Sequence, residues 1–282
     1  MNIKKISTAV ALAFAVCTVA SAGPVILESG NLKFTVANYD SAAVGYGNTA
    51  GLVCTTAATC ATAGGAVPGG VAGESSWGIF SISSISEIST GTTIWSAGAG
   101  QYLTGMFGGL QDYEVQVTNS ITGPSTTILD SGGWLNMYMN STNYTPADGP
   151  GGRTGQYAYT GITGGTLMLS ADFSPGILGG IPAATYTSTY QDASIGGTGE
   201  GYMDVTGGAW ASQLATDSLT DPNGGNHDLY LGTQFAANAT ATADGWTVIS
   251  ASQVFGAAPE PASLALFGLG LAGLAFLRRR RT

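Results

Sequence analysis

The sequence predicts an all-β protein, built as a single β-sandwich or jelly-roll-like domain over residues 23–255. Three observations favour this fold class. Short segments alternate apolar and polar residues, as half-buried strands do. Clusters of Gly, Pro, Asn and Asp separate these segments, as turns do. No long stretch of the domain repeats its apolar residues with the 3.6-residue period of a helix.

The expected strands follow one another along the whole domain. Residues 32–37 alternate Leu, Phe and Val with polar or small residues, and residues 77–85 are rich in the β-branched and aromatic side chains of buried strands. Further strands are expected at residues 92–96, 102–107, 113–118, 126–130, 134–139, 156–160, 167–173, 185–191, 201–206, 228–235 and 246–255. The absence of a fixed-period repeat from the sequence disfavours a solenoid or a propeller.

The domain is strongly acidic. Of the 8 Lys and Arg residues, only Lys33 and Arg153 lie between the two ends of the chain, against 16 of the 17 Asp and Glu residues, which gives this part a net charge near −14. Nucleic acid is therefore excluded as a partner, because phosphate neutralisation requires clustered Lys and Arg. Neutral glycans, divalent cations and basic surfaces remain compatible partners.

Two cysteines lie in the domain, Cys54 and Cys60. An even pair in an exported chain is expected to form one disulfide that closes a short loop. Zinc or redox chemistry would require further ligands or a C-x-x-C spacing, and the pair offers neither.

The first 22 residues have the order of a secretory signal peptide. Lys4 and Lys5 precede an apolar stretch, residues 9–20, and Ala20 and Ala22 supply the small residues that a signal peptidase reads. Cleavage is expected before Gly23. Cys17 raises a lipoprotein alternative, which the bulky residue before it disfavours.

The other end of the chain carries three features in order. Pro259, Glu260 and Pro261 are followed by an uncharged apolar run, residues 264–277, and then by a basic cluster made of Arg278, Arg279, Arg280 and Arg281. The run predicts a short transmembrane helix of about 21 Å, with the arginines on the cytoplasmic side as the membrane anchor stop. Residues 256–258 are expected to be a linker into this tail.

This order resembles the PEP-CTERM sorting signal over residues 259–282. The resemblance implies a Gram-negative bacterium and processing by an exosortase that removes the tail at or near the motif. It also implies a precursor held transiently in the inner membrane and a product at the cell surface or in the extracellular matrix. Residues 32–39 and 77–80 are similar to segments of other PEP-CTERM cargo proteins, including flocculation-associated ones. An ordinary C-terminal anchor is the alternative.

One turn suggests a weak calcium site. Asp221, Asn223, Asn226 and Asp228 place four oxygen-bearing side chains within eight residues, and Ca²⁺ prefers oxygen ligands from such loops. The alternative is a turn that needs no ion. No other cofactor is expected.

No residue is expected to be catalytic. His227 is the only histidine, and the domain lacks the Gly-x-Ser-x-Gly nucleophile motif. Asp112 and Glu114 are two residues apart on one expected strand face, so a glycoside hydrolase stays open as an alternative.

Aromatic residues could form a carbohydrate platform, because sugar faces stack on rings. The candidates are Trp134, Tyr138, Tyr144, Tyr157 and Tyr159, and a role in the core is the alternative. The expected function is non-enzymatic: adhesion, flocculation or association with a biofilm polysaccharide. A secreted glycan-active hydrolase and a passive surface spacer are the alternatives.

Overall fold

The computed structural model describes residues 30–47, 50–121 and 123–258. Its strands are β1 Gly30–Ala42, β2 Gly51–Cys54, β3 Ser76–Glu87, β4 Thr93–Ser96, β5 Tyr102–Ser120, β6 Gly123–Asn140, β7 Arg153–Gly155, β8 Ala158–Tyr159, β9 Thr166–Ser174, β10 Tyr186–Gln191, β11 Gly196–Gly207, β12 Leu219–Thr220, β13 Asn226–His227, β14 Leu229–Ala236 and β15 Val248–Ala258. The helices are α2 Ala57–Gly64, α3 Ala211–Leu214 and α4 Ala239–Ala243, with 3-10 turns at Pro146–Asp148 and Pro150–Gly152.

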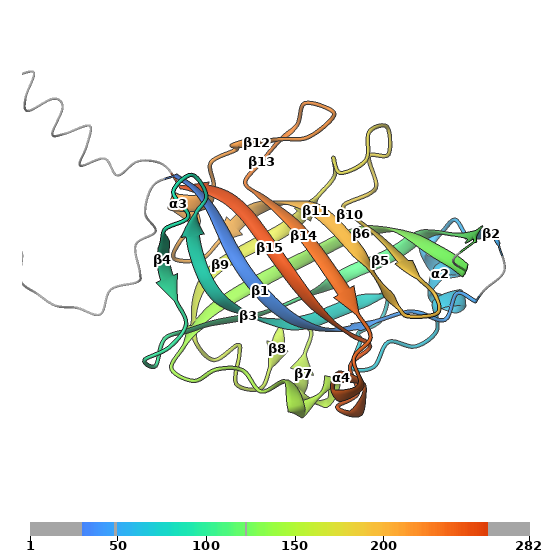
Figure 1. Ribbon diagram of the computed structural model, residues 1–282, viewed down its shortest axis with the longest axis horizontal. Helices are drawn as coiled ribbons and strands as arrows, with labels where there is room; N and C mark the ends of the chain where they lie inside the picture. Colours follow the sequence, from blue (N-terminus) through green and yellow to red (C-terminus); the bar gives the residue numbers. More distant parts are fainter. Residues whose placement is uncertain (1–29, 48–49, 122, 259–282) are drawn as a thin grey trace, which may run out of the picture.

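Eight antiparallel strands close into a barrel (Figure 1). The order around the barrel is β1, β3, β5, β6, β9, β11, β14 and β15, and β15 pairs again with β1. β9 and β10 occupy the same position in the sheet, because both lie between β6 and β11. β10 pairs with residues 125–130 of β6, and β9 pairs with residues 134–139 of β6. Each of the eight barrel strands therefore has a partner on both sides, while the short strands β2 and β4 pair only with β5 and β3.

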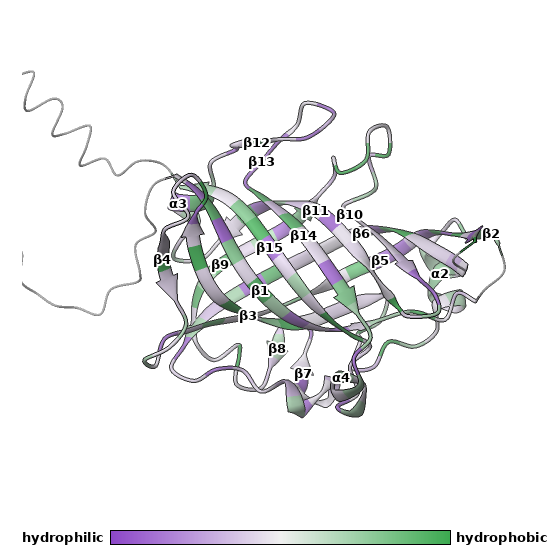
Figure 2. Ribbon diagram, viewed as in Figure 1, coloured by the Kyte–Doolittle hydropathy of each residue, from purple (hydrophilic) through white to green (hydrophobic). Residues whose placement is uncertain are grey.

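The predicted sandwich or jelly roll is wrong, because the sheet is closed on itself. The alternation of apolar and polar residues over 32–37 identified the inward face of β1, where Leu32, Phe34 and Val36 are buried. Figure 2 shows the hydropathy of the residues along the barrel strands. Alternation is identical in the two architectures, however, since both bury one face of each strand. Closure depends on which strands pair, and that is a tertiary property.

The two longest strands, β5 and β6, form a hairpin in the barrel wall between β3 and β9. β5 and β6 each merge two segments that the sequence predicted as separate strands, and they pair from Tyr102 with Asn140 to Ser120 with Gly123. Gly109 and Gly133 lie between paired positions at the middle of this hairpin with φ of 73° and 102°. A Cβ on Gly133 would lie 2.6 Å from Leu110 Cδ2, so both the backbone conformation and the space require glycine.

Apolar side chains fill most of the barrel interior. Leu32, Phe34 and Val36 of β1 are buried, and the same core contains residues of every barrel strand, such as Ile82, Leu103, Met137, Ala171, Met203, Leu229 and Val254. A second apolar layer covers the outside of β1, β3 and β5, where Trp77, Tyr159 and Trp246 pack together. The chain from residue 141 to residue 165 thus closes one outer side of the barrel.

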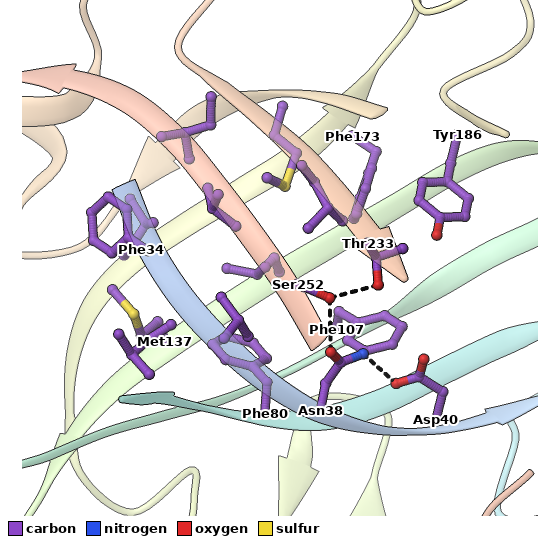
Figure 3. A pocket seen from close by; sticks show the side chains of 18 of the residues that line it. Phe34, Asn38, Asp40, Phe80, Phe107, Met137, Phe173, Tyr186, Thr233 and Ser252 are labelled. Carbon is purple, nitrogen blue, oxygen red and sulfur yellow. Dashed lines mark hydrogen bonds between the residues drawn. The ribbon is translucent and has the colours of Figure 1, made fainter. Parts of the chain in front are cut away.

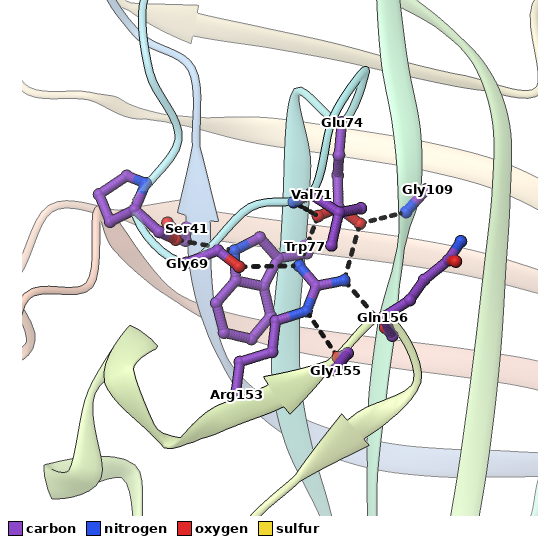
Figure 4. Close-up of polar contacts among 10 residues, drawn as sticks. Ser41, Gly69, Val71, Glu74, Trp77, Gly109, Arg153, Gly155 and Gln156 are labelled. Carbon is purple, nitrogen blue, oxygen red and sulfur yellow. Dashed lines mark hydrogen bonds and ion pairs between the residues drawn. The ribbon is translucent and has the colours of Figure 1, made fainter.

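One buried ion pair fastens this outer layer. Arg153 binds both carboxylate oxygens of Glu74, with 3.2 Å between Nη2 and Oε1, and its guanidinium lies 4.4 Å from the centre of the Trp77 ring (Figure 4). The side chains of Arg153 and Glu74 are 3% and 1% exposed. The Glu74 carboxylate also accepts hydrogen bonds from the backbone N–H groups of Val71 and Gly109.

The predicted disulfide is confirmed: Cys54 at the end of β2 is bonded to Cys60 in α2. Residues 256–258, expected to be a linker, instead form the end of β15, where they pair with Leu32, Asn31 and Gly30 of β1. The predicted transmembrane helix at residues 264–277 lies outside the described residues. Within the described residues, no helix is long and apolar enough to cross a membrane.

Candidate functional site

The outer face of five neighbouring strands carries a hollow of about 510 Å³. It extends across β10, β11, β14, β15 and β1, so about four interstrand spacings of about 4.8 Å give it a length of about 19 Å. The outward-facing side chains that line it are mainly hydroxyl and amide groups, with two aromatic rings and one carboxylate: Thr35, Thr187, Thr189, Thr198, Glu200, Tyr230, Gln234, Gln253 and Phe255. We call this the outer groove.

Strand register builds the polar part of the outer groove. Glu200 of β11 lies opposite Gly232 of β14, Gly232 lies opposite Gln253 of β15, and Gln253 lies opposite Thr35 of β1. Because directly opposite residues point to the same face of a sheet, these positions form one row across the barrel. Gly232 has no side chain, so the row is lowered at its centre.

A row of aromatic rings borders this polar row. Tyr202, Tyr230 and Phe255 are consecutive register partners on β11, β14 and β15. Their ring centroids are 5.4 Å apart for Tyr202 and Tyr230 and 6.2 Å apart for Tyr230 and Phe255. All three residues are partly exposed. Their rings therefore offer a partly apolar ledge beside hydrogen-bonding groups.

Glu200 holds Tyr230 in place within the outer groove. The Tyr230 hydroxyl donates a hydrogen bond of 2.6 Å to Glu200 Oε2. Burial, followed by the hydrogen bond and the charge of Glu200, raises the pKa of Tyr230 above its usual value. The phenol therefore stays protonated and keeps its orientation at neutral pH.

His227 joins the aromatic row at its far end. Its ring stacks on Tyr202 at 4.8 Å, with 18° between the ring planes. Nδ1 lies 3.0 Å from Asp204 Oδ1, and Nε2 lies 3.3 Å from Asp221 Oδ2. These contacts fasten the β12–β13 turn to the barrel, so His227 has a positioning role in the fold.

The four residues of the predicted calcium turn do not point to one place. Oδ1 of Asp221 accepts hydrogen bonds from the backbone N–H groups of Asn223 and Gly225, at 2.6 and 2.9 Å. Asp228 instead accepts from the backbone N–H groups of Val205, Thr216 and Asp217.

The other two residues of this turn, Asn223 and Asn226, are exposed. Among the described residues, no group of three or more His, Cys, Asp or Glu side chains is arranged to hold a metal ion. Calcium binding at this turn stays a prediction.

The five aromatic residues proposed from sequence belong mainly to the apolar layer outside β1, β3 and β5. Tyr159 is 2% exposed, while Trp134, Tyr138 and Tyr144 pack against the same layer. Tyr157 is 52% exposed and lies 4.7 Å from the Trp134 ring. The outer groove was not predicted, because its aromatic residues become neighbours only through strand pairing.

The acidic pair Asp112 and Glu114 does not share a face, because a bulge separates these two residues in β5. Asp112 is buried and lies opposite Asp130 of β6, and the two carboxyl groups share a hydrogen bond. Glycoside hydrolysis requires two carboxyl groups about 5–9 Å apart, with sugar or water between them. The buried pair lacks this separation.

The comparison with protein families concerns the end of the chain. The model for the PEP-CTERM protein-sorting motif matches residues 257–281. The chain carries a PEP-CTERM sorting motif. It is therefore an exported cell-surface protein that an exosortase processes.

The motif begins at the barrel itself. Residues 257 and 258 belong both to the matched range and to β15, so the PEP-CTERM segment follows the last barrel strand without a linker. Pro259, Glu260, Pro261 and the arginines at 278–281 lie outside the described residues, as do Ala20 and Ala22 of the predicted signal peptide. Neither a curated protein nor a solved structure matches this chain.

Proposed function

We propose that this PEP-CTERM protein is a non-enzymatic component of the extracellular matrix and binds a neutral polysaccharide along the outer groove. Adhesion, flocculation or biofilm assembly is the biological role that such binding would serve. The single observation that carries the proposal is the row of partly exposed rings, Tyr202, Tyr230 and Phe255, beside a row of hydroxyl and amide side chains.

The chemistry of the outer groove fits sugar better than other polymers. Aromatic rings stack on the apolar faces of sugars, while Thr and Gln side chains both donate and accept hydrogen bonds. A domain net charge near −14 disfavours polyanions, because it repels them at low ionic strength. The outer groove is open and elongated, so a polysaccharide chain could lie along it and extend beyond both of its ends.

The test is affinity electrophoresis of the processed protein in gels that contain neutral glucans or the exopolysaccharide of the native host. We expect Tyr230→Ala and Phe255→Ala to weaken binding by about tenfold each, since each removes one stacking surface. Tyr157→Ala is the matched control, because it removes an exposed ring outside the outer groove. Equal losses in all three variants, or no retardation of the wild type, would overturn the proposal.

A second measurement separates direct binding from bridging by divalent ions. Direct contact through rings and hydroxyl groups predicts that EDTA leaves the retardation unchanged. Loss of retardation in EDTA would instead assign the interaction to a bound cation, with the turn at Asp221 to Asp228 as the first candidate.

A further inference from the structure

The three rings that border the outer groove are inclined to one another. The planes of Tyr202 and Tyr230 differ by 55°, and those of Tyr230 and Phe255 differ by 31°. Neighbouring strands of a barrel are twisted and follow a curved wall, so outward side chains on successive strands point in diverging directions. The rings therefore form a turned surface in which no two neighbouring planes are parallel.

Two contacts fix the plane of the central ring. A Cβ on Gly232 would lie 3.6 Å from Cε1 and 3.9 Å from the hydroxyl oxygen of Tyr230, so the ring leans over this glycine. The hydroxyl group reaches β11, where Glu200 accepts its hydrogen bond. The Tyr230 ring is thus held at both its edge and its oxygen, and it does not rotate freely to meet a ligand.

His227 fixes the plane of the first ring. Its imidazole stacks on Tyr202 with only 18° between the two ring planes. Both imidazole nitrogens lie within hydrogen-bond distance of a carboxylate, one from Asp204 and one from Asp221. Because both nitrogens are engaged, the imidazole keeps its orientation, and the Tyr202 ring that lies against it keeps its inclination.

The barrel wall beneath the rings is also fastened from the inside (Figure 3). The Ser252 hydroxyl of β15 lies 2.9 Å from Asn38 Oδ1 of β1 and 2.6 Å from Thr233 Oγ1 of β14. All three residues are buried, and hydrogen bonds are stronger in such an environment than in water. They join three of the strands whose outer faces line the groove. The curvature of this wall is therefore a property of the free protein.

We propose that the outer groove selects a coiled neutral chain of the β-1,3-glucan type over a flat β-1,4-linked ribbon. Such selection rests on the proposed function, since it presupposes glycan binding in this groove. Successive sugar faces of a β-1,4-linked glucan lie nearly in one plane, which suits parallel rings. A β-1,3-linked glucan coils, so its successive sugar faces are inclined to one another, as the three rings are.

The rigidity of the rings turns this match of shapes into a difference in affinity. A platform that is already arranged for its ligand spends little free energy on ordering when it binds. Tyr202, Tyr230 and Phe255 stack together on a coiled chain. A flat ribbon that lies on one of these rings leaves the inclined neighbours without a sugar face.

The experiment is isothermal titration calorimetry of the processed protein with β-1,3-linked and β-1,4-linked glucose oligomers of equal length. The two oligomers have the same composition and no charge, so only the linkage differs. We expect the β-1,3-linked oligomer to bind about tenfold more tightly, because the flat chain loses stacking on at least one ring.

Two variants test the part played by ring inclination. Tyr202→Ala removes the most inclined ring, and His227→Ala leaves that ring but frees its plane. Each should lower the preference for the β-1,3-linked oligomer to about threefold or less, mainly by weakening the binding of that oligomer. Tyr157→Ala, which removes an exposed ring outside the outer groove, is the matched control and should keep the full preference.

The ratio of the two affinities separates ring inclination from a general loss of structure, which would weaken both oligomers alike. Circular dichroism checks the fold of His227→Ala, and Tyr202→Ala truncates a partly exposed side chain. Failure of both oligomers to bind, equal affinities, or an unchanged preference in Tyr202→Ala would each overturn the inference. Affinity electrophoresis with the host exopolysaccharide decides the proposed function separately, because retardation there requires no particular linkage.

Discussion

Gly30 and Ala258 lie directly opposite each other where β1 meets β15. The first and last described residues are therefore neighbours at one end of the barrel. Both the segment that follows the predicted signal peptide and the segment that carries the sorting motif must join the barrel at this end. We expect cleavage before Gly23 and beyond Ala258 to leave the pairing of β1 with β15 intact, because all the paired residues lie between these positions.

The sorting motif should act independently of the barrel. Glu260→Ala changes the central residue of the Pro-Glu-Pro motif without touching β15, so we expect the native host to accumulate the unprocessed chain. Intact mass and fractionation measure this: the wild type should begin at Gly23 and lack the arginines at 278–281. Glu200→Ala, a glutamate change within the barrel, is the control and should be processed normally. Normal processing of Glu260→Ala would contradict the assignment.

The Tyr230–Glu200 hydrogen bond should matter for glycan binding through the position of the ring. Glu200→Gln keeps an acceptor at this position, whereas Glu200→Ala removes it, so the alanine variant should bind more weakly by a few-fold. Affinity electrophoresis of both variants measures the difference. If the glutamine variant binds as weakly as the alanine variant, the carboxylate charge and not the ring position decides affinity.

The buried Arg153–Glu74 pair should be essential for stability. Glu74→Gln leaves an uncompensated charge in the outer layer, which is expected to cost about 3–5 kcal/mol of unfolding free energy. Lys33→Met, which removes the other basic side chain of the domain, should change stability by less than about 0.5 kcal/mol. Denaturant unfolding measures both. The double variant Glu74→Gln with Arg153→Met should cost less than the sum of the single changes.

Stability should fall as pH rises from about 4 to about 7. The pKa of Asp40 is about 7 in the folded chain and 3.8 in an unconstrained one, so within this window the folded chain binds more protons. Stability then decreases with pH, by at most roughly 4 kcal/mol for this group. The raised pKa values of Asp112 and Asp130 act in the same direction.

Thermal unfolding across this pH range measures the effect. Asp40→Asn should weaken the pH dependence of the melting temperature. Asp172→Asn should leave this dependence as in the wild type, and it serves as the control for removing one negative charge from an acidic domain. A wild type whose melting temperature rises between pH 4 and pH 7 would contradict the orientation of these carboxyl groups toward the interior.

Individual strands were predictable because their signal is local. The alternation around Leu32, Phe34 and Val36 identified the inward face of β1, and the even pair of cysteines in an exported chain indicated the disulfide of Cys54 and Cys60. The outer groove was not predictable, since Thr35 and Gln253 are far apart in sequence and become neighbours only when β1 pairs with β15. The same holds for Asp112 and Asp130, whose pairing depends on the register and the bulge of β5.

The sequence by itself determined the destination of this protein and the character of its domain. The sorting tail is a linear signal, and period-2 alternation is a local property of extended chains, so both can be read residue by residue. Only the tertiary structure decided that the strands close into a barrel. Closure requires β15 to return beside β1. It creates an outer face with a ring-lined groove and an interior in which the buried carboxyl groups of Asp112 and Asp130 become neighbours.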